Sequence, residues 1–437
     1  MFEKVFKLQE NKTNVRTEFI GGLTTFLAMA YILFVNASIL KDAGMNPTAV
    51  FAATAIAAII GSLLMGLYAN LPIALAPGMG MNAFFAYVIV LKFGYSWQDA
   101  LAATLIAGII FFIISISGIR KVIIRSIPEP LKIAVGVGIG FFITFIGLQE
   151  AGIIVADAAT YITIGNLTTP TTLLALFGLV VTIVLMARKV KSAVFIGIIV
   201  TAIAGLITGL SSLPDSLFKL PHNEIAETFG VAITNIPNFV TTGSIFNVLI
   251  IVFVLVFVDF FDTAGTIVAV TKAGGLTDKE GEIKNADRAF TADSISTMTG
   301  AIVGTNTTTS YIESLAGISV GAKTGLASVF TALFFLIFLF ISPVLAIILP
   351  AVTAPALILV GSLMAKEMGK IDFDDFPVAI GAFTTMLLIV LSYNISKGLA
   401  FGFLIYSIAM IAAGRMKEVP IIIYILDIFF IIVLFFT

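Results

Sequence analysis

Apolar stretches long enough to span a membrane recur along the whole chain, separated by short polar segments. Crossing about 30 Å of hydrocarbon takes roughly 20 residues of helix, and fewer where the helix is interrupted. The pattern predicts an all-α polytopic membrane protein with fourteen transmembrane segments. These segments cover residues 18–40, 48–69, 73–91, 98–118, 132–149, 171–187, 192–210, 245–271, 288–304, 307–322, 325–341, 354–365, 376–392 and 397–414. A further apolar stretch, 419–436, carries Asp427, and its sequence fits a span and an interfacial helix equally well.

Basic residues orient the predicted segments, because short cytoplasmic loops carry an excess of Lys and Arg. With the N-terminus in the cytoplasm, few of the 24 Lys and Arg residues fall in outer segments. Those few are Lys41, Lys92, Lys219 and Lys397. A missed or extra segment before residue 414 would destroy this asymmetry, so it supports both the number of segments and a cytoplasmic N-terminus.

Composition narrows the class of protein further. The chain is 59% hydrophobic and 11% charged, with a mean hydropathy of +1.13, whereas ordinary soluble domains are about 25% charged. A net charge of −1 provides no field that would attract nucleic acid. The chain has no cysteine and a single histidine, His222, which argues against disulfides and against a metal site built from these residues. We therefore predict a multi-pass membrane protein without metal or cofactor.

The longest outer segment, residues 211–244, divides the chain into two halves of seven segments each. Because seven is odd, the second half must lie upside down relative to the first. Inverted repeats of this kind are typical of secondary transporters. The sequence therefore predicts a 7+7 inverted repeat.

The third and tenth segments, which occupy matching positions in the two halves, are both interrupted. The third contains Pro77, Gly78 and Gly80 at membrane depth, where proline removes a backbone donor and glycine disfavours helix. The tenth begins with residues 305–311, Thr-Asn-Thr-Thr-Thr-Ser-Tyr, a run that favours extended backbone. Interrupted segments at matching positions indicate a transporter binding site.

Carboxylates in the predicted segments are the main candidates for binding. We single out Asp259 and Asp262 in the eighth segment and Glu313 in the tenth, because each acid near the bilayer centre costs roughly 2.5–3.5 kcal/mol. Helical spacing places Asp259, Asp262, Thr263 and Thr266 on one face, which should point into the protein and adds Thr263 to the candidate substrate-binding residues. The alternative is a structural role, such as capping broken backbone or pairing with Lys272. That lysine lies near the inner membrane edge and can extend to water, which makes it a poor partner for Asp259.

Other polar and aromatic residues of the interrupted segments complete the predicted pocket. Asn82 occupies a place in the third segment comparable to that of Glu313 in the tenth. Carboxylates accept hydrogen bonds from ring N–H and amino groups, while asparagine both donates and accepts. Tyr311, Phe84 and Phe85 would supply flat apolar walls. Such a pocket suits a small, planar, polar heterocycle.

Four stretches of the chain resemble a known family, the nucleobase transporters that include uracil and xanthine permeases. The similarity is greatest to the AzgA-like branch of guanine/hypoxanthine/adenine permeases. The stretches are residues 14–26 (NVRTEFIGGLTTF), 76–83 (APGMGMNA), 259–265 (DFFDTAG) and 308–317 (TTSYIESLAG). The resemblance covers essentially the whole chain.

The resemblance implies a fold with a core domain and a gate domain, each built from both halves of the chain. The third and tenth segments would each contain a short strand that leads into a half-helix. The family also suggests a homodimer formed through the gate domains. The implied division is core 1–118, gate 119–210, outer connecting loop 211–244, core 245–341, gate 342–414 and an apolar tail 415–437.

The resemblance also implies roles for individual residues. The substrate-binding acids of the family fall on Asp259 and Glu313, and the other important polar positions of the branch fall on Asn82 and Asp262. Uracil permeases usually have Glu at the position of Asp259, so the shorter side chain here leaves room for a bicyclic purine. Some uracil permeases have a histidine at the position of Thr263, and a proton step through that histidine cannot operate in this chain.

Together these observations predict an importer of purine nucleobases, guanine and hypoxanthine and also adenine, in the inner (cytoplasmic) membrane. It would work by proton symport with alternating access, with Asp259, Asp262 and Glu313 as candidate proton carriers. A carrier or channel for another small planar or anionic solute, such as uracil, xanthine or an inorganic anion, is the alternative. An intramembrane enzyme is disfavoured, because the two aspartates share one helix instead of facing each other.

Overall fold

The computed structural model describes residues 2–117, 127–214, 216, 218, 219, 222–276 and 285–436. In the first half of the chain the elements are α1 Phe2–Phe6, α2 Val15–Met29, α3 Ile32–Asp42, α4 Pro47–Leu64, β1 Leu75–Pro77, α5 Met79–Ala83, α6 Trp97–Ile116, α8 Glu129–Glu150, β2 Ile154–Asp157, β3 Tyr161–Ile164, α9 Pro170–Ala187 and α10 Ala193–Ile207. In the second half they are α11 His222–Thr228, α12 Val231–Thr234, α13 Ile236–Thr242, α14 Ile245–Ala273, α15 Ala286–Val303, β4 Thr308–Ser310, α16 Ser314–Ile318, α17 Gly325–Leu339, α18 Pro350–Ala365, α19 Phe376–Leu391, α20 Ile395–Ala412 and α21 Ile421–Phe436.

Within these described residues, eight helices are long and apolar enough to cross a membrane, judged by length and composition. They are Val15–Asp42, Pro47–Ala69, Trp97–Ile116, Glu129–Glu150, Pro170–Ala187, Ile245–Lys272, Pro350–Lys370 and Ile395–Ala412. Shorter apolar helices accompany them, among them Met79–Lys92, Ala193–Ile207, Gly325–Leu339 and Phe376–Leu391. The protein is therefore a mostly helical, multi-pass membrane protein.

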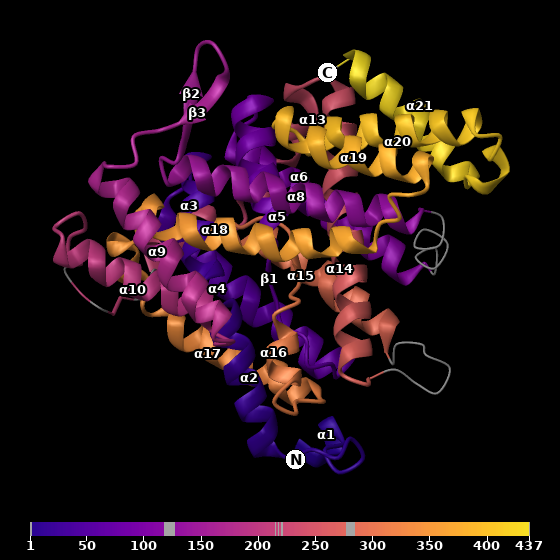
Figure 1. Cartoon of the computed structure of the whole chain (residues 1–437). Helices are drawn as coiled ribbons and strands as arrows, with labels where there is room; N and C mark the ends of the chain where they lie inside the picture. The colour runs from indigo at the N-terminus through magenta and orange to yellow at the C-terminus, as the bar shows by residue number, and fades with distance from the viewer. Residues whose placement is uncertain are drawn as a thin grey trace.

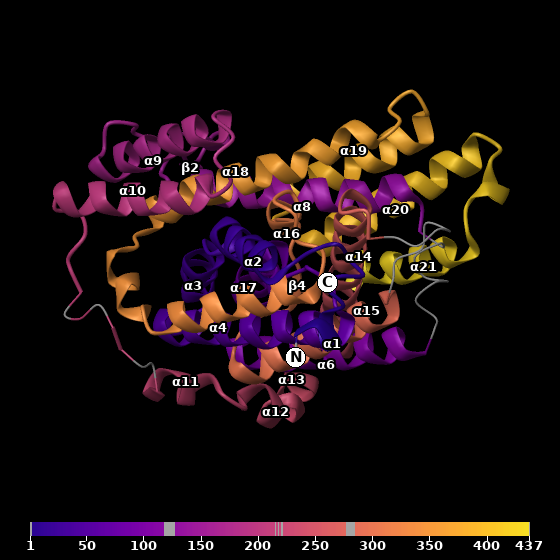
Figure 2. The same ribbon diagram turned by 90° about the horizontal axis from the view of Figure 1, so that it is seen from below.

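The helices pack as two groups, which Figure 2 shows as two layers. The first group consists of α2, α3, α4, α6, α14, α15 and α17, which surround the strands β1 and β4. The second group consists of α8, α9, α10, α18, α19 and α20, with α8 packed against both α18 and α19. Contacts of α8 with α5, of α18 with α3 and of α14 with α20 join the groups. Each group draws helices from both halves of the chain.

Local sequence explains where several of these helices begin. Asn46 accepts hydrogen bonds from the backbone N–H groups of Thr48 and Ala49, and Pro47 occupies the first position of α4. Ser96 and Asp99 form a reciprocal capping box at the start of α6. The carboxylate of Asp99 also accepts hydrogen bonds from the side chains of Asn235 and Asn238, which ties the segment after α12 to this cap.

Two regions outside the central bundle add features that the hydrophobic pattern did not specify. The hairpin of β2 and β3 lies between α8 and α9, and both strands are largely exposed. The stretch predicted at 419–436 forms the single helix α21, which packs against α20 and α14. In Figure 1 this helix lies at the periphery, close to α20.

Candidate substrate-binding site

The two interrupted segments pair as antiparallel strands, β1 and β4, which are labelled near the centre of the molecule in Figure 1 and Figure 2, respectively. Leu75 lies opposite Ser310, and Pro77 lies opposite Thr308. Gly78 N–H bonds to the carbonyl of Thr307, and such bonds alternate along an antiparallel pair. This alternation places Pro77 at a position whose backbone nitrogen forms no hydrogen bond to β4. Proline, which lacks an N–H, is therefore compatible with the strand pair.

The backbone carbonyl groups of Pro77 and Thr308, which lie opposite each other, point away from the strand pair. Each accepts a hydrogen bond from a side chain instead. The hydroxyl of Tyr311 donates to the carbonyl of Pro77 at 2.5 Å. The hydroxyl of Thr297, on α15, donates to the carbonyl of Thr308 at 2.9 Å. Both strands are buried, so these bonds avoid the cost of an unpaired carbonyl in an apolar interior.

A short helix follows each strand. β1 leads into α5, which contains Asn82 and continues as a π-helix over Phe84–Lys92. β4 leads through Tyr311 into α16, and Glu313 occupies the position before its first residue. Each interrupted segment thus contains a short strand followed by a short helix. Asn82 and Glu313 therefore lie just after the paired strands β1 and β4.

Carboxylates on two neighbouring helices form a buried polar network with β4. Asp259, on α14, accepts a hydrogen bond from Thr297 at 2.9 Å. Asp293, on α15, accepts hydrogen bonds from Thr263 at 2.8 Å and from Ser310 at 2.9 Å. Both carboxylates are at most 1% exposed. The network therefore holds α14, α15 and β4 together through acids that are shielded from bulk solvent.

Asp262 and Glu313 face open space instead. Asp262 is exposed, and a Cβ on Gly265, three residues further along α14, would meet no atom within 4 Å. Glu313 accepts a 2.6 Å hydrogen bond from the hydroxyl of Tyr31. It also lines a cavity of about 270 Å³, which is bounded by residues of both helix groups, including Lys189 and Val360. Of the predicted acids, Asp259 thus belongs to the buried network and Glu313 lines the cavity, while Asp262 is exposed and lines neither.

The remaining predicted residues are buried beside the crossing. Asn82 and Phe84 are fully buried, and Tyr311 is 5% exposed with its hydroxyl engaged by Pro77. The amide nitrogen of Asn82 lies 3.9 Å from the sulfur of Met79. Among the described residues, Oδ1 of Asn82 and Oδ1 of Asp259 are buried acceptors without a hydrogen-bond partner. These two atoms are free to accept hydrogen bonds from a ligand.

Sequence reasoning missed three residues of this site. Asp293 lies inside the predicted ninth segment, so it is an acid within a membrane-spanning helix, as Asp259 is. The Thr and Ser residues around Asp293 lower the hydrophobicity of that helix, and the acid is therefore less conspicuous. Thr297 and Tyr31 carried no signal in sequence, because hydroxyl and aromatic side chains are common throughout the chain. Their importance follows from which carboxylate each contacts.

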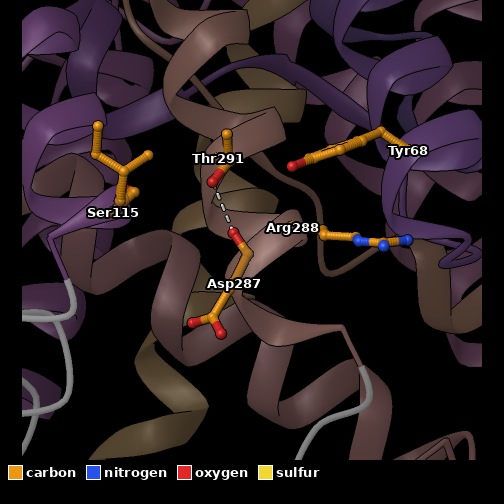
Figure 3. A pocket seen from close by; sticks show the side chains of 6 residues that line it. Tyr68, Ser115, Asp287, Arg288 and Thr291 are labelled. Carbon is orange, nitrogen blue, oxygen red and sulfur yellow. Dashed lines mark hydrogen bonds between the residues drawn. The ribbon is translucent and has the colours of Figure 1, made fainter.

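A second cavity, of about 320 Å³, lies away from these residues (Figure 3). It is lined by Tyr68, Ser115, Ile116 and the first turns of α15, where the Thr291 hydroxyl donates to the backbone carbonyl of Asp287 at 2.7 Å. Arg288 lies over the ring of Tyr68, 5.5 Å from its centroid. The cavity contains none of the predicted binding residues, so it is not the candidate site.

Interrupted segments that cross at the centre of a helical membrane protein, with acids around the crossing, define the class of secondary transporters. Residues 16–401 match the profile of the Permease family (Xan_ur_permease), and the chain belongs to this family of nucleobase permeases. It is accordingly a transporter and not an enzyme.

Individual relatives match almost the whole chain. The chain is 48% identical to the guanine/hypoxanthine permease PbuG of Bacillus subtilis, with 98% of each chain covered. It is 38% identical to the adenine permease AdeP of Escherichia coli, covering 96% of this chain and 92% of that one. Among solved structures, the transmembrane domain of the cyanobacterial bicarbonate transporter BicA has the same fold, with a TM-score of 0.65 and 16% identity over 87% of this chain and 96% of that one.

Proposed function

We propose that the protein imports purine nucleobases, guanine and hypoxanthine and also adenine, by proton symport. The observation that carries this proposal is the 48% identity to a guanine/hypoxanthine permease across 98% of both chains. The adenine permease relative extends the candidate substrates to a third purine. All three bases are planar and carry N–H donors that match the acceptors of the candidate site.

The geometry supports a specific mode of binding. Asp259 and Asn82 each offer a buried oxygen without a partner, and Glu313 faces the 270 Å³ cavity. A purine edge would donate N–H groups to Asp259 and Glu313, with Asn82 completing the contact. Phe84 and Tyr311 would pack beside the ring, and Thr263 would position the network through Asp293. Leaving a buried acceptor unpaired costs about 1–3 kcal/mol, which substrate binding would recover.

The proposed transport cycle moves one helix group against the other. We infer fourteen segments in a 7+7 inverted repeat, with residues 1–118 and 245–341 as the core domain and 119–210 and 342–414 as the gate domain. The N-terminus would lie in the cytoplasm, as the basic residues predict, and the membrane would be the inner membrane. The 270 Å³ cavity lies between the two groups, where rocking of the core would open and close access. A homodimer through the gate domains is part of the same proposal.

Proton coupling requires an acid whose protonation changes with substrate binding. Asp259, Asp262 and Glu313 remain the candidates, because Asp259 is buried, Asp262 is exposed and Glu313 lines the 270 Å³ cavity. Burial disfavours a charged carboxylate unless it is compensated. A proton taken up with the base would remove that cost during translocation.

Uptake of radiolabelled hypoxanthine in a host that lacks its own purine carriers tests the proposal. We expect saturable uptake that collapses with a protonophore and in the variants Asp259→Asn and Glu313→Gln. Unlabelled guanine, adenine, xanthine and uracil compete in parallel and rank the substrates. Uptake that survives both substitutions would place the site elsewhere. Absence of uptake for every base, with correct membrane insertion, would contradict the proposed function and favour an anion carrier.

A further inference from the structure

One hydroxyl group in the buried network has two acceptors. Oγ1 of Thr297 lies 2.9 Å from Oδ2 of Asp259 and 2.9 Å from the backbone oxygen of Thr308. A hydroxyl carries one hydrogen, and a carbonyl oxygen cannot donate. Both contacts are full hydrogen bonds only if the third group, Asp259, supplies a proton of its own.

The two protonation states of Asp259 therefore give two arrangements. When Asp259 is protonated, its O–H donates to Thr297, and the Thr297 hydroxyl donates to the carbonyl of Thr308. When the Asp259 O–H bond breaks and the proton leaves to water, the Thr297 hydroxyl rotates to the carboxylate without breaking its own O–H bond. The Thr308 carbonyl then loses its donor.

Burial makes this difference matter. Thr297 and Thr308 are fully buried, and Thr308 lies opposite Pro77 in the strand pair, where its carbonyl has no partner in the ladder. A buried carbonyl without a donor is unfavourable by about 1–3 kcal/mol. The hydroxyl of Thr308 donates to Ser296 at 2.7 Å and does not replace the missing donor. The strand β4 therefore responds to the proton on Asp259.

We propose that Thr297 is a positioning residue that transmits the protonation of Asp259 to β4, and thereby links proton binding to purine binding. The inference rests on the proposed function. It goes further in naming the group through which the proton affects the substrate site. In the protonated state Oδ2 of Asp259 donates to Thr297, and the neutral Oδ1, which has no partner, is left to accept an N–H of the base.

The other charged groups that face Asp259 are acidic. Asp293 on α15 and Asp262 on α14 both interact with it, and Asp262 in turn faces Glu313. The ammonium of Lys132 lies 5.9 Å from the centroid of the Phe261 ring and forms an ion pair with Glu129 at 2.7 Å.

The chain offers a matched control. The hydroxyl of Ser328 is also shared between two acceptors, the carbonyls of Leu71 at 2.8 Å and Ile73 at 3.0 Å, but neither of these can bind a proton. Ser328→Ala therefore removes a shared buried hydroxyl without touching a titratable group. Thr297→Val removes the proposed connection, and Thr297→Ser keeps the hydroxyl.

The first experiment measures hypoxanthine counterflow in proteoliposomes with the full-length protein. In the native protein and in Thr297→Ser and Ser328→Ala, we expect the half-saturation concentration to change by up to about tenfold per pH unit, as linkage to one proton requires. In Thr297→Val we expect counterflow to persist while this change falls below about twofold. An unaltered pH dependence in Thr297→Val would overturn the inference and leave purine transport intact, whereas no counterflow by the native protein would overturn both.

The second experiment reads the carboxyl group directly and does not depend on transport. Infrared difference spectra of purified native protein and Asp259→Asn isolate the stretching band of the protonated Asp259 carboxyl. We expect this band to shift in Thr297→Val, or in Thr297→Ala if the valine variant does not fold, and to stay in place in Ser328→Ala. Absence of a protonated Asp259 band in the native protein without substrate would overturn the inference. A band whose frequency is the same in the native protein and in the Thr297 variant would also overturn it.

Discussion

The hydroxyl of Tyr31 donates a 2.6 Å hydrogen bond to Oε1 of Glu313, a residue 282 positions further along the chain. Tyr31 lies between α2 and α3, and Glu313 precedes the first residue of α16. Both side chains line the 270 Å³ cavity. The bond therefore fixes the orientation of the predicted substrate-binding acid from a different part of the core.

We predict that Tyr31→Phe raises the half-saturation concentration for hypoxanthine about tenfold or more, because a hydrogen bond to a charged group contributes about 1.5–3 kcal/mol. The maximal rate and the amount of protein in the membrane should change little. Concentration-dependent uptake of labelled hypoxanthine measures both parameters. Tyr424→Phe is the control, because its hydroxyl donates to the backbone carbonyl of Met416, away from the candidate site. An equal effect of both substitutions would contradict the positioning role of Tyr31.

Asp293 provides a second prediction. It accepts hydrogen bonds from Thr263 and Ser310, and so connects α14 with β4. Asp293→Asn should reduce hypoxanthine uptake at least tenfold, since an amide in this position presents its NH2 group to one of the two hydroxyls in place of an acceptor.

A double-mutant cycle tests whether Asp293 acts through this network. Combining Asp293→Asn with Thr263→Val should lower uptake by less than the product of the single effects, because both substitutions break the same bond. Asp99→Asn serves as the comparison, because Asp99 is also buried but its carboxylate contacts Ser96, Asn235 and Asn238 at the start of α6. Strictly additive effects of the Asp293 pair would show that the two residues act independently.

These residues also show how far sequence alone leads to the site. Pro77 and the polar run at 305–311 indicate interrupted segments because proline and β-branched residues disfavour helix locally. The register between β1 and β4 is a long-range property, and no local pattern pairs Pro77 with Thr308. Tyr31 illustrates the same limit, since one aromatic residue among many becomes significant only through its contact with Glu313.

Asp293 illustrates a different limit, because its signal was present in the sequence. The helix around it contains Thr291, Ser294, Ser296 and Thr297, which lower its average hydrophobicity and make an acid less conspicuous. The structure shows that Ser296 and Thr297 belong to the buried network, whereas the hydroxyls of Thr291 and Ser294 donate to backbone carbonyls of their own helix. A polar face within a predicted segment is therefore itself an indication of a binding region.

Arg415 gives a prediction about the C-terminal region. Its guanidinium contacts both carboxylate oxygens of Asp375 at 2.8 Å, and it also binds Glu418, which precedes α21. Hydrogen bonds from Arg415 lower the pKa of Glu418. A lowered pKa means that the stabilisation is present above the ordinary pKa of about 4.3 and is lost as the pH falls through the lower, folded-state value.

We therefore expect Arg415→Gln to lower the melting temperature of detergent-solubilised protein slightly at neutral pH. The difference in melting temperature between the native protein and the variant should shrink in acid below about pH 4, as Glu418 becomes protonated in both the folded and the unfolded protein. Because Glu418 is exposed and Arg415 is partly exposed, the effect at neutral pH should also decrease with added salt. Melting curves at several pH values measure it. A difference that persists unchanged in acid would assign the role of Arg415 to packing instead of charge.

The glycines of α8 give the last prediction, because they differ in what surrounds them. At Gly140 and at Gly361 of α18 the two helices are so close that a Cβ on Gly361 would overlap Thr144 and the carbonyl of Gly140. A Cβ on Gly136, about one turn earlier in α8, would meet nothing within 4 Å.

Gly361→Ala should therefore destabilise the protein by about 1–3 kcal/mol through overpacking. Gly136→Ala should leave stability unchanged or raise it slightly, since alanine favours helix by roughly 0.5–1 kcal/mol over glycine. Thermal unfolding of the purified variants compares them, and equal melting temperatures would show that α8 and α18 can separate without cost.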